Sequence, residues 1–297
     1  MSTAHEARAG DAPAEPPRQD QVIDSHQHFW RYERSQYRWI DGSMAVLQHD
    51  FLPFDLRDTM RAAGVDATIA VQARQDGDET EWLVELANEH SFIKGVVGWV
   101  DLRAADVESQ LERVGHESCI VGIRHVVQAE ADGFLDGAAF RRGVTALGRF
   151  DLVYDILIYP RQLPEALRFA AAFPGQRFVL DHLGKPDVRG GGFDSWRRDI
   201  TALAALPHVW CKLSGLVTEA DWQAWTPAAL RPYLDTALET FGPRRLLFGS
   251  DWPVCTVAAT YGQVIALVRD AIAEYSADEQ SRILGGTAAD VYLRMES

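Results

Sequence analysis

The sequence predicts a single-domain α/β fold, a (β/α)8 TIM barrel, and three observations lead to that prediction. Eight short apolar runs recur along the chain, most of them nearly continuous in apolar character, as in parallel strands buried on both faces. Helical patterns separate most of these runs. Seven intervals cover the 225 residues from Val22 to Leu247, about 32 residues each, which matches the repeat of such a barrel.

The expected strands are short stretches rich in β-branched and aromatic residues. In chain order they occupy residues 22–26, 67–73, 94–100, 120–126, 152–158, 177–182, 208–215 and 245–252. The expected helices show apolar residues at a helical period. They occupy residues 78–90, 105–115, 163–173, 195–206, 227–242 and 257–275.

Residues 30–56 separate the first two strands and are rich in aromatic residues without a helical period. We expect this long insertion to cover the mouth of the barrel. A doubly wound open sheet is the alternative fold. The Gly-x-Gly-x-x-Gly motif that would favour it does not follow the first strand.

Residues 1–20 contain three prolines and no periodicity, so we expect a flexible tail, with the barrel spanning residues 21–297. The tail lacks the apolar segment of a secretory signal, and no later stretch approaches about 18 consecutive apolar residues. Three scattered cysteines are too few for a disulfide framework. These features predict a cytoplasmic protein without a membrane partner.

Composition narrows the class of function. A hydrophobic content of 47% is sufficient for a large core and excludes a disordered chain. With 29 basic and 43 acidic residues, the net charge is −14, which disfavours binding to phosphate backbones. We therefore expect no nucleic-acid partner. The motifs of serine hydrolases, HExxH zinc proteases and P-loop enzymes are absent from the sequence.

Polar residues at the ends of the expected strands are the candidates for an active site, because strand C-termini build the site in this fold. The first strand ends in His26 and His28, whose spacing places both imidazoles on one face. His182 follows the sixth strand and Asp251 the eighth. Together these residues form a ligand set for a divalent metal such as zinc. Each taken alone is also compatible with a purely structural role.

Four spaced motifs carry a family resemblance. They are VIDSHQHFW with a following YRWID, then DHLGKP, KLSGL and LLFGSDWP. From residue 22 to about residue 290 the chain resembles the amidohydrolase superfamily, specifically its branch of L-fuconolactonase-like and L-rhamnonolactonase-like sugar lactonases. The resemblance implies a (β/α)8 barrel and hydrolysis of a carbonyl compound, most often a lactone.

The resemblance also bears on the metal. Binuclear members of the superfamily carry a carboxylated Lys or a Glu at the end of strand four and a His at strand five. This chain has Arg124-His125 and Tyr154-Asp155 at those places. A binuclear centre is therefore not expected, and the resemblance implies a single weakly held zinc or no metal.

Lactone hydrolysis requires an activated water, stabilisation of the oxyanion and an acid for the departing ring oxygen. We expect Asp251 to take a proton from water and return it to the leaving alkoxide. His28, His182 or a metal would polarise the carbonyl, and His26 would be a metal ligand or an orienting group. The expected partner is a small-molecule sugar lactone such as L-fuconolactone; the sequence does not predict an oligomeric state.

Several further residues are candidates for substrate binding. Only three lysines accompany 26 arginines, and two of them, Lys185 and Lys212, lie near strand ends. Arg124 ends strand four and is an analogous ligand for an anion or a carbonyl oxygen. Each of these charges has an alternative role in a solvated rim or a local ion pair.

Aromatic residues also fall at strand ends. Trp30 and Trp252 are candidates for apolar walls of a sugar site, and Tyr154 for a hydrogen-bond donor to the substrate. The alternative is that all three fill the core. Residues 187–193 contain three consecutive glycines, and we expect them to form a mobile lid.

Two other functions stay open at this point. One is a lactonase for a carboxylated intermediate of aromatic degradation, or a metal-dependent decarboxylase on the same barrel. Relatives with decarboxylase activity carry a metal-binding His at strand five, where this chain has Tyr154-Asp155. The other is a barrel that binds a sugar or a metal without turnover.

Overall fold

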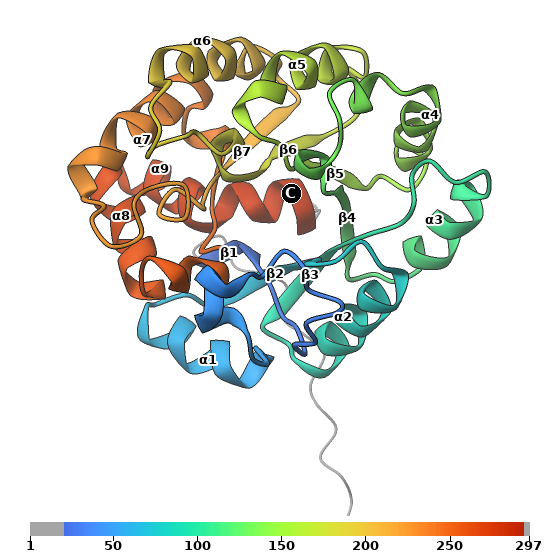
Figure 1. The fold of residues 1–297 in the computed structure, drawn as a ribbon, viewed down its shortest axis with the longest axis horizontal. Coiled ribbons are helices and arrows are strands. Elements are labelled where there is room, and N and C mark those ends of the chain that lie inside the picture. Colours follow the sequence, from blue (N-terminus) through green and yellow to red (C-terminus); the bar gives the residue numbers. More distant parts are fainter. Residues whose placement is uncertain (1–20, 294–297) are drawn as a thin grey trace, which may run out of the picture.

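A computed structural model describes residues 21–293 of the chain (Figure 1). Eight parallel strands follow one another around the sheet in chain order, which confirms the predicted barrel. They are β1 Ile23–Gln27, β2 Ala67–Val71, β3 Ile93–Gly98, β4 Ile120–His125, β5 Val153–Ile156, β6 Phe178–Leu180, β7 Val209–Leu213 and β8 Leu246–Phe248. The predicted tail at residues 1–20 lies outside the described residues.

The barrel closes at the carboxyl ends of β1 and β8. Gln27 forms a parallel bridge with Trp252. The backbone N–H of His28 donates to the carbonyl of Trp252 at 2.7 Å, and that of Asp251 donates to the carbonyl of His26 at 2.8 Å. These hydrogen bonds close the sheet and rule out the open-sheet alternative. They also hold the segment with His26 and His28 next to the segment with Asp251.

Helices surround the barrel in Figure 1. They are α1 Pro53–Ala62, α2 Gly77–Glu89, α3 Val107–Gly115, α4 Ala138–Leu147, α5 Leu163–Ala171, α6 Phe193–Ala204, α7 Pro227–Phe241, α8 Tyr261–Ala271 and α9 Ala277–Ser281. Within the described part of the chain, no helix combines the length and the apolar character needed to span a bilayer.

Three helices, α1, α4 and the short α9, were missing from the sequence prediction. The α1 helix begins inside the segment expected to be a loop, where Pro53 is its first residue and the side chain of Asp55 accepts from the backbone of Leu52 at 2.8 Å. The α4 helix contains Gly143, which obscures its helical pattern. A Cβ at this position would lie 2.0 Å from the carbonyl oxygen of Leu102, so the glycine permits close packing.

The aromatic insertion between β1 and α1 packs over one side of the barrel mouth, as expected. Trp30 is fully buried and lies 5.3 Å from Phe51 and 5.8 Å from Tyr37, measured between ring centroids. Its indole N–H donates to the carbonyl of His49 at 2.9 Å. The short helix η1, Gly42–Leu47, continues this layer and contacts η7, Val254–Val257, beyond β8.

The opposite end of the barrel is filled by the C-terminal segment. It includes two π-helical turns: η8 Arg282–Gly286 contacts β1 and β8, and η9 Ala289–Leu293 packs against the inward-facing side chains of the strands. Val291 and Tyr292 join a cluster with Ile69, Val97 and Val153. The interior is therefore a packed core, covered by this segment at the end where the strands begin.

Candidate active site

A cavity of about 360 Å³ lies at the carboxyl end of the barrel. Its wall includes five of the residues predicted from the sequence, namely His28, Arg124, His182, Lys185 and Asp251. They come from β4 and from the segments after β1, β6 and β8. The fold thus brings together side chains that are up to 223 residues apart, at the place where this fold builds active sites.

The paired histidines of β1 lie against each other. Their Nε2 atoms are 3.2 Å apart, and both rings are buried. Nδ1 of His28 lies 2.7 Å from the carbonyl oxygen of Val71, so the ring carries its hydrogen on Nδ1 in the neutral form. Nε2 of His28 then presents a lone pair to the cavity, where it accepts a hydrogen bond from water or binds a cation.

His182 lies on a left-handed turn directly after β6. The φ angles of His182, Leu183 and Lys185 are 53°, 55° and 52°, in a region that side-chain-bearing residues rarely occupy. Nδ1 of His182 lies 2.8 Å from the hydroxyl of Ser214. When that hydroxyl donates, Nε2 of His182 carries the ring hydrogen and becomes a donor toward the cavity.

Gly215 makes room for this ring. A Cβ at Gly215 would lie 2.6 Å from Nδ1 of His182, and its φ of +68° also favours glycine. The loop after β7 therefore positions His182 in two ways, through the Ser214 hydroxyl and through the missing side chain of the next residue.

Asp251 occupies the centre of the group. Its Oδ1 lies 3.5 Å from Nε2 of His28 and 3.9 Å from Nε2 of both His26 and His182. Burial raises the pKa of Asp251, but at the acid pH where His182 and His28 are protonated, the charge of His182 and a hydrogen bond from His28 outweigh burial and hold that pKa below its usual range. The side chain is therefore a carboxylate at neutral pH.

The surrounding imidazoles are neutral at the same pH. Burial lowers the pKa of His182 to about 4, and burial also lowers the pKa of His28 and of His26 below their ordinary values. An ionised carboxylate among neutral imidazoles is the protonation state that a general base requires.

A charge cluster lies beneath this group, inside the barrel. Nζ of Lys212 is 2.6 Å from Oδ2 of Asp155, 3.0 Å from Oδ1 of Asp181 and 3.1 Å from Nδ1 of His26. The guanidinium of Arg124 donates to Oδ2 of Asp181 at 3.0 Å and to the carbonyl of Gln72. The cluster fixes the ring of His26 from below.

Four predicted substrate ligands are not on the cavity wall. Lys212 is fully buried in the charge cluster, and Tyr154 is enclosed by Phe140, Phe169 and Phe178 on the outer side of β5. Trp30 is part of the aromatic layer, and Trp252 packs on Phe51 at 5.2 Å between ring centroids. Each of these side chains has packing or ion-pair partners away from the cavity wall, and its role as a substrate ligand stays a prediction.

The structure adds wall residues that the sequence prediction missed. Glu219, Thr218 and Trp222 come from the loop after β7, Trp39 from the aromatic insertion and Tyr159 from the segment after β5. The sequence contained one indication, because Thr218 and Glu219 are polar residues shortly after the KLSGL motif. The predicted lid, residues 187–193, does not line this cavity, and its motion stays a prediction.

The donor set fits a divalent metal. His26, His182 and Asp251 each offer one ligand atom, these atoms lie within 4.8 Å of one another, and all three residues are buried. His28, predicted as a fourth ligand, is outside this group but adjoins it. Positive charge also lies close, since the guanidinium of Arg124 is 3.2 Å from Nε2 of His26. Repulsion from this guanidinium weakens the binding of a metal cation at the site.

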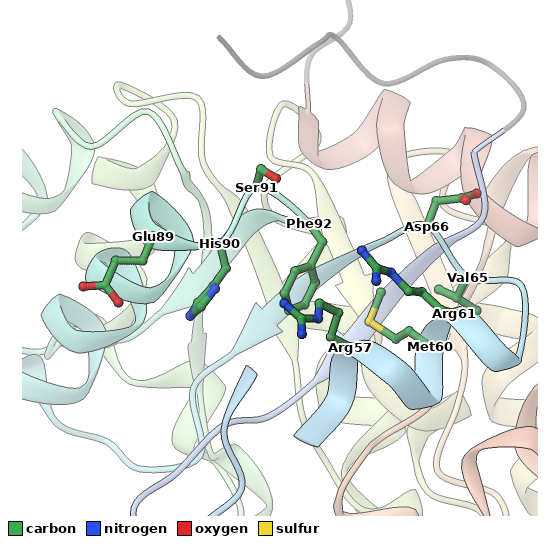
Figure 2. Close-up of a pocket in the computed structure, with 9 residues that line it drawn as sticks. All are labelled: Arg57, Met60, Arg61, Val65, Asp66, Glu89, His90, Ser91 and Phe92. Atoms are coloured by element: carbon green, nitrogen blue, oxygen red, sulfur yellow. The ribbon is translucent and has the colours of Figure 1, made fainter. Parts of the chain in front are cut away.

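A separate cavity of about 260 Å³ lies at the other end of the barrel. Figure 2 shows Arg57, Met60 and Arg61 projecting from α1 beside Phe92, which precedes β3. None of the predicted site residues lines this cavity. Its position at the amino ends of β2 and β3 is the face of this fold that contributes stability rather than catalysis.

Comparisons with known proteins agree with this geometry. The amidohydrolase family model matches residues 23–294. An L-fucono-1,5-lactonase from Burkholderia multivorans is 49% identical over 284 residues, which covers 91% of this chain and 95% of the relative. An L-fucono-1,5-lactonase from Burkholderia ambifaria is 35% identical over 277 residues, covering 91% and 94%.

Solved structures give the same result. A crystal structure of an amidohydrolase from Burkholderia multivorans with bound zinc matches with a TM-score of 0.89 and 48% identity, covering 92% of this chain and 99% of that chain. A second crystal form of an amidohydrolase from that organism, with bound HEPES, matches with a TM-score of 0.89 and 46% identity over the same shares.

Proposed function

This chain belongs to the amidohydrolase family, and from that premise we propose that it hydrolyses a neutral sugar lactone of the L-fucono-1,5-lactone type to the open-chain aldonate. The family and the two lactonases at 49% and 35% identity identify it as a hydrolase acting on a lactone. The observation that carries the mechanism is the ionised Asp251 among neutral imidazoles at the cavity.

Asp251 acts on water in this proposal. Its carboxylate takes a proton as the water oxygen attacks the lactone carbonyl carbon, and His28 orients the water through the lone pair on Nε2. The bond between the carbonyl carbon and the ring oxygen then breaks. Asp251 returns the proton to the leaving alkoxide, which yields a hydroxyl group and a carboxylic acid. One water is consumed, and the acid releases its proton at neutral pH.

The oxyanion requires hydrogen-bond donors. The hydrogen bonds that each nearby side chain already makes decide whether it has a hydrogen left to donate. His28 is excluded as a donor in the neutral form, because its one ring hydrogen points to the carbonyl of Val71. Nε2 of His182 carries a hydrogen when Ser214 donates to Nδ1. Arg124 lines the cavity, and its guanidinium carries positive charge within 3.2 Å of Nε2 of His26. We assign His182 and Arg124 to the oxyanion.

A divalent metal such as zinc would be held by His26, His182 and Asp251. When bound, it would supply Lewis-acid polarisation of the carbonyl or a more acidic water. The two neighbouring cations, Arg124 at 3.2 Å and Lys212 at 3.1 Å from the ring nitrogens of His26, support weak rather than tight binding.

Proton release from a panel of five- and six-membered aldonolactones tests the proposal, after subtraction of spontaneous hydrolysis. We expect rapid turnover of a deoxy-sugar lactone and loss of turnover in Asp251→Asn. A rate at background for every lactone in the panel would contradict the proposed function.

A further inference from the structure

A pair of opposite charges lies on the cavity wall beside the reacting group. Nζ of Lys185 is 3.3 Å from Oε1 of Glu219, and both residues line the cavity. The side chains are 19% and 20% exposed, so they are partly desolvated but open to a ligand. Lys185 follows β6 and Glu219 follows β7.

The backbone around the pair is held in place. The N–H of Lys185 donates to the carbonyl of His182 at 2.8 Å, and Nζ lies 5.6 Å from the ring centre of Tyr159. The carbonyl of Glu219 accepts from the N–H of Arg189 at 3.2 Å. The two head groups are therefore positioned before a ligand arrives, which reduces the entropy lost on binding.

The chemistry of this pair suits hydroxyl groups. An ammonium only donates hydrogen bonds and a carboxylate only accepts them, whereas a hydroxyl group does both. Two neighbouring hydroxyls can therefore bond to both members at once. Trp222 lies on the same wall, with its indole N–H bonded to the carbonyl of Thr218 at 2.8 Å, and offers an apolar face to a sugar ring.

The charges of the wall disfavour an anionic ring. Arg124 and Lys185 are the Lys and Arg residues of this wall, and each is already paired with a carboxylate, Asp181 or Glu219. Glu219 and Asp251 add negative charge at the cavity. A lactone with a carboxylate beside this pair would meet the negative charge of Glu219, and the cation there, Lys185, is already paired.

We propose, resting on the proposed function, that Lys185 and Glu219 form the subsite that binds lactone hydroxyl groups remote from the reacting carbonyl. This subsite selects neutral polyhydroxylated lactones over both unsubstituted and carboxylated ones. It makes Lys185 and Glu219 specificity residues for the same cavity in which Asp251 performs the chemistry.

The test compares three substrates: a six-membered aldonolactone, the unsubstituted δ-valerolactone and a lactone carrying a ring carboxylate. For Glu219→Gln and Lys185→Met, we expect the ratio of kcat/KM for the aldonolactone to that for δ-valerolactone to fall about 10- to 100-fold. We also expect Glu219→Gln to raise kcat/KM for the carboxylated lactone, because it removes a repulsive charge.

Glu85→Gln on the exposed face of α2 and Lys94→Met on β3 are matched controls for the same changes of side chain, and the ratio should not change in them. An equal loss of kcat/KM on all three substrates in Glu219→Gln and Lys185→Met would overturn the subsite. It would show that the pair acts on the reacting group and not on the hydroxyls.

Failure of the subsite and failure of the proposed function give different results. If the unmodified enzyme hydrolyses the aldonolactone but both variants keep its substrate ratio, only the subsite is wrong. If the unmodified enzyme turns over none of the lactones, the proposed function is wrong. In that case, calorimetric titration still measures the affinity of the subsite for the aldonolactone. It compares Asp251→Asn with the double variant that also carries Glu219→Gln, and equal affinities would overturn the subsite.

Discussion

Asp251 and His28 face each other across the seam where the barrel closes, with Oδ1 of Asp251 3.5 Å from Nε2 of His28. The backbones beside them are joined, since His28 donates to Trp252 and Asp251 donates to His26. The contact between Asp251 and His28 thus depends on the same hydrogen bonds that join the first and last strands.

The first prediction concerns Asp251→Asn. We expect kcat/KM on the preferred lactone to fall by about 100- to 10,000-fold, the usual contribution of a general base. The fold should persist, because Asn tolerates the positive φ of 57° at this position. Steady-state kinetics and circular dichroism check both statements. Asp58→Asn on the surface of α1 is the control, and an Asp251→Asn enzyme with unchanged kcat/KM would exclude the assigned role.

The second prediction concerns pH. Burial lowers the pKa of His182 to about 4, and the pKa of Asp251 is lower than usual as well, so both stay in their active forms until acid pH. We expect kcat/KM to be retained down to pH of about 5 and to decline as His182 becomes protonated near 4. Circular dichroism at each pH separates titration from unfolding. Half-loss near an ordinary histidine pKa of about 6.5 would contradict this.

The third prediction uses two glycines with nearly the same φ. Gly215 has φ +68° and Gly242 has φ +69°, but a Cβ at Gly215 meets the His182 ring at 2.6 Å, whereas at Gly242 nothing lies within 4 Å. Both alanine variants should lose stability from backbone strain, and Gly242→Ala by about 1–3 kcal/mol, because its φ of 69° with ψ of 168° is a conformation that glycine alone adopts readily. Only Gly215→Ala should lose activity, by more than about tenfold, because it displaces His182. Equal kinetic losses in both would refute this positioning role.

These results show which parts of the site the sequence could predict. His26 lies near the end of β1, and His28, His182 and Asp251 follow strands with strong apolar patterns. Their placement at the barrel mouth therefore follows from topology alone. Tyr154 and Asp155 are adjacent in β5, and alternation requires that one faces the barrel interior and the other the helices. The sequence does not determine which of the two residues faces the interior. In the structure it is Asp155, which bonds to Lys212 there.

The sequence also did not predict how far below the barrel mouth the side chain of Lys212 lies. Lys212 lies inside β7, where it pairs in register with Leu247 of β8, and Asp251 comes four residues after that partner. Its side chain therefore ends in the charge cluster below the cavity. The Lys185–Glu219 pair was missed for another reason: it joins two loops, and loop conformations have no periodic pattern from which contacts follow.

The fourth prediction concerns that charge cluster. Lys212→Met leaves Asp155 and Asp181 buried without their ammonium partner, and we expect the free energy of unfolding to fall by about 3–5 kcal/mol. Adding Asp155→Asn should recover part of the loss, because it removes one uncompensated charge. Urea denaturation measures both, with Lys94→Met as control. Additive effects in the double variant would argue against direct coupling.

The fifth prediction concerns metal. We expect the metal-free enzyme to bind one zinc per chain through His26, His182 and Asp251, and His182→Gln to weaken binding by more than about tenfold. His90→Gln, at the opposite end of the barrel, should not. Isothermal titration calorimetry measures the affinity. Because nearby cations oppose tight binding, most lactonase activity should survive a chelator, and complete loss that zinc restores would contradict this.

The C-terminal segment bears on how the interior assembles. Tyr292 donates its hydroxyl hydrogen to Oδ1 of Asp155 at 2.7 Å, and its ring lies 5.4 Å from Nζ of Lys212. This residue follows all eight strands in the chain, so during synthesis the ribosome releases it after every strand of the barrel. The charge cluster beneath Asp251 is thus completed by a turn that is made after all eight strands, and a chain interrupted before residue 292 would expose the Asp155 carboxylate to solvent from below.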